Sequence, residues 1–149
     1  TETFEKKFEI YIEKKREEYD FILIDSIPTM DIDKKFVEHS DKIIVPTFCD
    51  YSTTAGTIKV IKEAGVEKVH SVIVNLFKPT SNQTKYYLDL KNVLEETDVI
   101  FPEPIQELSV IEGLIEKGKT IWESKSKKLL KAQNSLLDII DGMVEDIKE

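Results

Sequence analysis

Apolar residues near the start of the chain recur with the period of an α-helix. Phe4, Phe8 and Ile12 share one face among glutamates and lysines. This spacing predicts an amphipathic helix over residues 2–18.

Continuous apolar runs follow, and each is short and bounded by polar or turn-forming residues. Such runs are typical of strands buried on both faces of a parallel sheet. The predicted strands are residues 19–25, 42–46, 68–76 and 98–101. Helical periodicity separates them, with predicted helices at 31–39, 52–64, 81–96, 108–117 and 124–148. Ser52 or Thr53 is the expected cap of the helix that ends before Gly65.

Strands that alternate with helices imply parallel pairing through crossover connections. The fold class predicted for residues 1–149 is therefore a single α/β domain of three layers, with a mainly parallel sheet and a long carboxy-terminal helix. Ligands of such sheets bind outside the carboxyl ends of the strands. The polar residues that follow the strands are thus the candidate site.

Composition narrows the class of protein. The 149 residues are 40% hydrophobic and 34% charged, as in a globular domain. The apolar runs are too short to span a membrane, and no secretion leader opens the sequence, so we expect a cytoplasmic protein without membrane contact. A formal net charge of −8 argues against a dedicated nucleic-acid binder. Cys49 is the single cysteine, which excludes a disulfide framework.

Five segments resemble, in order, the motifs of ParA/MinD-type (Soj-like) partitioning ATPases. They are Tyr-Asp-Phe-Ile-Leu-Ile-Asp-Ser-Ile-Pro at 19–28, Ser-Asp-Lys-Ile-Ile-Val-Pro at 40–46, Tyr51 with Gly56, Val-Ile-Val-Asn at 72–75, and residues 105–121. The resemblance runs from about residue 19 to the end. It implies an incomplete P-loop NTPase-like fold.

The resemblance also assigns roles to individual residues. Asp25 would be the catalytic Walker B acid that holds Mg²⁺, directly or through water. Ser26 and Pro28 would begin the segment that senses the γ-phosphate of ATP. Asn75 would hydrogen-bond the adenine edge, and Gln106 would form part of the wall beside the base.

The implied function is an ATP- and Mg²⁺-dependent switch that controls dimerisation and the binding of DNA or a partner. The implied partners are a second copy of the chain and a centromere-binding protein, while non-specific DNA binding is disfavoured by the net charge. Residues 113–120 have the Gly-x-x-x-x-Gly-Lys-Thr spacing of the phosphate-binding loop of this family, but they overlap a predicted helix, whereas that loop follows a strand. We therefore do not interpret Gly118-Lys119-Thr120 as the phosphate-binding loop. We therefore expect the chain alone to bind ATP poorly and to be inactive as an enzyme.

Two alternatives stay open at this point. One is a naturally truncated, non-catalytic relative that acts as an interaction module. The other is a different α/β protein in which Asp25 serves another purpose. His39 and His70 are too few and too far apart in sequence to indicate a metal site.

Overall fold

The computed structural model describes residues 3–25 and 32–146. The chain divides into two units, Thr1–Asp41 and Lys42–Glu149, and each is described by itself. The prediction of one domain over 1–149 stays a prediction.

The described residues of the amino-terminal unit form two helices, α1 (Phe4–Arg16) and α2 (Ile32–His39). Their aromatic side chains pack together: the ring of Phe8 meets the ring of Phe36 edge-on at 5.1 Å between centroids, and it stacks on Phe4 at 6.0 Å. The helical periodicity of the first residues is confirmed, because the apolar face of α1 is the face that these rings use.

The segment between the two helices corrects the strand predicted at 19–25. Residues 21–25 have no regular secondary structure, and Leu23 is 79% exposed. A strand exists only where a neighbouring strand accepts and donates its backbone hydrogen bonds. Within the residues that the structure describes, no strand pairs with this run, so its apolar pattern alone does not make it a strand.

The carboxy-terminal unit is built on a parallel strand pair. Strand β1 (Ile43–Thr47) leads through α3 (Tyr51–Ala64) to β2 (Val69–Val74), with Thr47 opposite Val74. Every residue of β2 is buried, as expected for a central parallel strand. The α/β class and both of these predicted strands are confirmed.

The strand predicted at 98–101 is reduced to one pairing, and two prolines explain why the ladder does not continue directly after it. Ile100 exchanges backbone hydrogen bonds with His70 and Val72, which extends the sheet for one residue. Pro102 and Pro104 then fall at the alternate positions that would next donate to β2, and a proline has no N–H. The ladder resumes only at Ile105, whose N–H donates to the carbonyl of Val74 at 2.9 Å.

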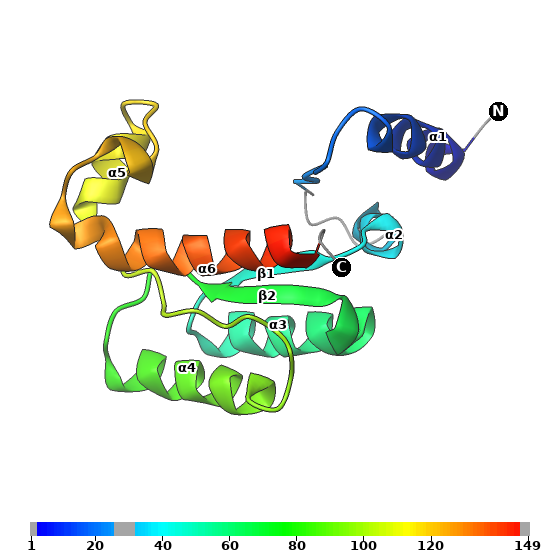
Figure 1. Ribbon diagram of the computed structural model, residues 1–149. Coiled ribbons are helices and arrows are strands. Elements are labelled where there is room, and N and C mark those ends of the chain that lie inside the picture. Colours follow the sequence, from blue (N-terminus) through cyan, green and yellow to red (C-terminus); the bar gives the residue numbers. More distant parts are fainter. Residues whose placement is uncertain (1–2, 26–31, 147–149) are drawn as a thin grey trace. The chain divides into compact units, whose positions relative to one another are not determined.

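Helices cover both faces of this strand pair (Figure 1). Helices α3 and α4 (Ser81–Leu94) lie against one face, and α6 (Leu130–Asp146) lies against the other. The largest fully buried side chains include Leu90 of α4 and Leu129 just before α6. These two residues mark the apolar layers on either side of β2.

The remaining elements are short. Helix α5 (Ser109–Ile115) ends before Gly118, whose φ of 64° is the left-handed conformation that glycine adopts readily. Single 3₁₀ turns at 121–123 and 127–129 precede α6, so the long helix begins later than the predicted residue 124. Among the described helices, none combines the length and apolar character that crossing a membrane requires.

Candidate functional site

The carboxyl ends of β1 and β2 lie at one edge of the sheet, as parallel pairing requires. The backbone N–H of Asn75 donates to the carbonyl of Thr47 at 2.8 Å, which continues the pairing one residue past β2. The hydroxyl of Thr47 is buried and hydrogen-bonds to that of Thr57 at 2.6 Å. The polar residues at the two strand ends are therefore fixed beside one another.

Asn75 begins a strained turn. Its Oδ1 accepts the N–H of Leu76 at 2.9 Å, and Leu76 has a φ of 52°. A leucine in the left-handed region is uncommon, and such strain collects at binding sites. The side-chain oxygen of Asn75 is engaged in this turn. The amide N–H₂ of this exposed residue is therefore the group that could donate to a ligand.

Gln106 lies on the segment next to this turn. Phe77 donates its N–H to the carbonyl of Ile105 at 3.0 Å, and Phe77 and Gln106 form a parallel bridge. The structure thus brings the predicted site residues Asn75 and Gln106 onto adjacent segments at the same edge. Both side chains are exposed.

Aromatic rings lie below these two segments. Tyr87 of α4 packs between Phe77, at 5.8 Å between ring centroids, and Phe101, at 5.3 Å. Burial raises the pKa of the Tyr87 phenol, and the nearby Glu103 raises it further. Aromatic rings from α4 and from the two segments thus pack together next to Asn75 and Gln106.

An acid follows β1 at this edge. The carboxylate of Asp50 caps α3, accepting the N–H of Thr53 at 2.8 Å and its hydroxyl at 2.7 Å. These two hydrogen bonds, the backbone one first, hold the pKa of Asp50 below its usual value. An acid thus occupies the helix N-terminus that could receive an anion. Asp50 also corrects the predicted cap at Ser52 or Thr53.

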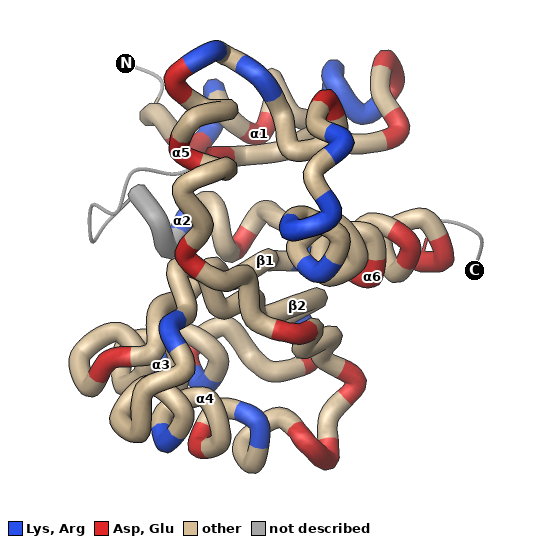
Figure 2. The backbone as a smooth tube through the Cα atoms, turned by 90° about the vertical axis from the view of Figure 1, so that its left-hand side faces the viewer, with Lys and Arg blue, Asp and Glu red and all other residues tan. Residues whose placement is uncertain are grey.

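One lysine near this edge forms an ion pair. The ammonium of Lys78 is 2.6 Å from the carboxylate of Glu107. Figure 2 shows lysines at the start of α6 and acids toward its end, and in Figure 1 the start of α6 lies on the side where β2 ends.

The other predicted site residues belong to the amino-terminal unit. Asp25 is exposed and ends the extended run 21–25, whereas Asn75 and Gln106 belong to the carboxy-terminal unit. Ser26 and Pro28 lie outside the described residues. Their roles stay predictions.

One cluster was missed by the sequence reasoning. Glu5 and Glu9 on α1 lie beside His39 at the end of α2. The only sequence signal is the four-residue spacing of the two glutamates, which places them on one helix face but says nothing of the histidine.

Comparisons with protein-family models, with curated proteins and with solved structures gave no match for this chain. The functional argument therefore rests on the site itself.

Proposed function

We propose that this chain is the carboxy-terminal part of a cytoplasmic partitioning ATPase of the ParA/MinD type, whose three-layer, P-loop NTPase-like sheet is incomplete in these 149 residues. The whole protein would use ATP and Mg²⁺ to switch its dimerisation and its binding of DNA or a centromere-binding partner. One observation carries the proposal. Asn75 and Gln106, assigned to the adenine by resemblance, share the carboxyl edge of a parallel strand pair.

The proposed division of labour follows from the chemistry of the edge. Asn75 offers a directional amide to the adenine, and the segment with Gln106 would lie beside the base. Asp25 would position Mg²⁺ in the whole protein. The chain alone has the base-recognising part and not the phosphate-recognising part, so it should bind adenosine and ATP about equally and weakly.

Nuclear magnetic resonance tests the proposal directly. Adenosine and ATP are titrated separately into the ¹⁵N-labelled chain up to about 10 mM, the range of weak binding. We expect shifts centred on Asn75, Leu76 and Gln106. Asn75→Ala should weaken binding about 2- to 10-fold, the value of one hydrogen bond. The matched control, Asn92→Ala on the exposed face of α4, should leave it unchanged.

Two outcomes would reject this function. One is the absence of shifts along the edge at the highest adenosine concentration. The other is an equal effect of the Asn75 and Asn92 substitutions, which would show that binding is unspecific. Asp25 is tested separately: Asp25→Asn should reduce any Mg²⁺ dependence of ATP binding and leave adenosine binding unaffected.

The second candidate function is a non-catalytic interaction module, and α6 carries the observation that favours it. The face of α6 opposite the sheet exposes apolar residues at roughly heptad spacing, which is the pattern of a helix that packs on a partner. These exposed residues are Leu130, Leu137, Ile140 and Val144.

Analytical ultracentrifugation tests this candidate. If a second copy covers this face, the chain should self-associate as its concentration rises, and Leu137→Gln should weaken the association. The control is Asn134→Gln, an exposed polar exchange on the same helix. A chain that stays monomeric, or equal effects of the two substitutions, would reject a self-associating module.

A further inference from the structure

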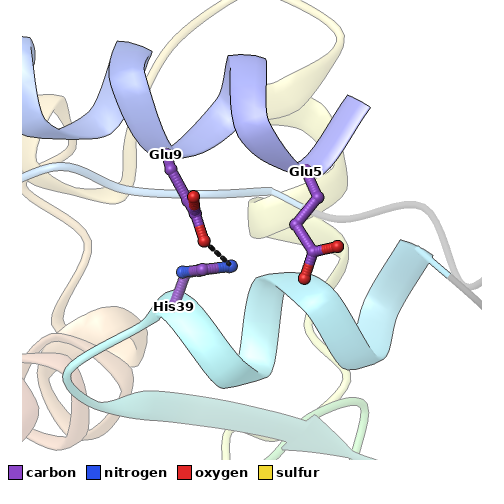
Figure 3. Close-up of side chains that lie close together, drawn as sticks. All are labelled: Glu5, Glu9 and His39. Carbon is purple, nitrogen blue, oxygen red and sulfur yellow. Dashed lines mark ion pairs between the residues drawn. The ribbon is translucent and has the colours of Figure 1, made fainter. Parts of the chain in front are cut away.

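Three side chains with metal-ligating atoms converge in the amino-terminal unit (Figure 3). Glu5 and Glu9 lie one turn apart on α1, and His39 is the last residue of α2. One ligand atom from each lies within 4.8 Å of the others. We propose that Glu5, Glu9 and His39 bind a divalent transition-metal ion such as Zn²⁺.

The histidine supplies the strongest observation. Its Nε2 is buried and has no hydrogen-bond partner. The nearest carboxylate oxygen, Oε1 of Glu9, lies 3.5 Å away, close enough for an ion pair but outside hydrogen-bond geometry. A buried nitrogen without a partner is destabilising, and a metal ion between Nε2 and Glu9 would satisfy it.

The distances suit a small ion. Zn²⁺ binds imidazole nitrogen and carboxylate oxygen at about 2.0–2.2 Å, so tetrahedral ligands lie about 3.4 Å apart. The separation of 3.5 Å between His39 and Glu9 already matches this value. The widest separation, up to 4.8 Å, must close by up to about 1.4 Å, which rotation of the glutamate side chains allows.

The donor set selects the class of metal. One imidazole and two carboxylates suit Zn²⁺ and its first-row neighbours, whereas Mg²⁺ and Ca²⁺ prefer oxygen ligands alone. Three protein ligands leave a fourth position for water. The ring of Phe8 meets the His39 ring at 5.8 Å between centroids, so the imidazole is oriented by packing before any metal binds.

Lys35 is the competitor for this site. Its ammonium pairs with Glu5, and that hydrogen bond is the main reason that the pKa of Glu5 lies below its usual value. Glu38 lies 3.6 Å from the same ammonium and offers Lys35 another partner. Metal binding therefore exchanges the lysine on Glu5 for the metal ion, and Lys35 should weaken metal affinity.

Isothermal titration of Zn²⁺ into the full chain measures the affinity. His39→Gln and Glu9→Gln should each weaken binding at least about tenfold, because each removes a ligand of the metal. Glu13→Gln, one turn further along α1, should change it less than about twofold. Lys35→Gln should strengthen binding, since it removes the competing cation from Glu5. Far-UV circular dichroism checks that each variant keeps its helices.

Co²⁺ provides a second readout in the unaltered protein. The chain has two histidines, His39 and His70, and His70 lies in the carboxy-terminal unit. Substoichiometric Co²⁺ should shift and broaden the ring signals of His39, with little effect on those of His70.

Clear results would overturn the site. They are unchanged Zn²⁺ affinity in His39→Gln, equal loss in Glu13→Gln, or a Co²⁺ effect that spares His39. Any of these would leave Glu9 and His39 as an electrostatic contact between two helices. The test uses no nucleotide, so its outcome is independent of the proposed ATPase function.

Discussion

The contact between α6 and the sheet can be tested at Gly142. A Cβ added at this position would lie 2.3 Å from Cδ1 of Ile100 and 3.1 Å from Nε2 of His70. The first distance is well inside van der Waals contact, so either Ile100 changes rotamer or α6 moves off the strand. The histidine ring is rigid and buried, which leaves little space for the helix to shift.

Two opposing terms set the magnitude for Gly142→Ala. Alanine stabilises a helix by about 1 kcal/mol relative to glycine. Overpacking of a filled interior costs about 1–3 kcal/mol. The net expectation is a loss of about 0–2 kcal/mol in the free energy of unfolding.

Gly56→Ala is the matched control. Gly56 lies on the exposed face of α3, and an added Cβ meets nothing within 4 Å. This substitution should stabilise the protein by up to about 1 kcal/mol. The two variants should therefore differ by about 1–3 kcal/mol, the cost of the contacts at Gly142 alone.

Urea unfolding followed by circular dichroism at 222 nm measures this difference in free energy. In thermal unfolding, the melting temperature should shift by about 2–4 °C for each kcal/mol. If Gly142→Ala stabilises the protein as much as Gly56→Ala does, α6 does not pack on His70 and Ile100. The reasoning about the buried face of α6 would then be refuted.

Three further outcomes are expected. The hydroxyl of Ser135, which is 2% exposed, donates a hydrogen bond to the carbonyl of Glu103 at 2.7 Å. Ser135→Ala should therefore lower the free energy of unfolding, measured in urea, by about 1–3 kcal/mol. An unchanged free energy would contradict this hydrogen bond. Asp50→Ala should lower the melting temperature at about pH 7 but much less at about pH 2.5. A carboxyl whose pKa is lowered by folding stabilises the protein at pH values above its unfolded pKa. This stabilisation is lost as the pH falls through the folded pKa. An equal difference at both pH values would exclude the charged cap. Burial, together with the charge of Asp50, raises the pKa of the Cys49 thiol to about 11. At about pH 8, a thiol reagent should therefore react about 100-fold more slowly with the folded protein than with the urea-unfolded chain. Equal rates would contradict this raised pKa.

Sequence reasoning succeeded where the signals are local. Helix α3 ends at Gly65, whose φ of 88° allows the turn that the sequence predicts there. Strand β2 was predicted from its continuous apolar run, and all of its residues are buried. The parallel pairing followed from the length of the crossover through α3, and it placed Asn75 at the candidate edge.

Sequence reasoning failed where an element depends on its neighbours. The run 21–25 has the composition of a buried strand, but an apolar run becomes a strand only when it has a pairing partner. Residues 98–101 were also predicted as a strand, but only Ile100 pairs with β2, and Pro102 and Pro104 remove the next two donors from the ladder. In both cases the available hydrogen bonds, rather than the apolar composition, decided the outcome.

The carboxy-terminal helix shows a limit of periodicity. Its apolar residues divide between two faces. Ile139 is buried, whereas Leu137 and Ile140 are exposed. A helix that is apolar on two faces has more surface to bury than one sheet can cover. The sequence reveals the excess of apolar residues, but only the packing shows which of them have no partner.

The proposed metal site illustrates why counting ligands along a sequence is insufficient. Two histidines far apart in sequence do not indicate a metal, and glutamates four residues apart are ordinary on a charged helix. Packing of Phe8 on Phe36 joins α1 to α2 and places His39 beside Glu9. Carboxylates from one helix then complete a donor set that the histidines alone could not form. Because that set depends on aromatic packing, Phe36→Ala should weaken Zn²⁺ binding without removing any ligand. Unchanged Zn²⁺ affinity in this variant would show that the packing of α1 on α2 does not position the donors.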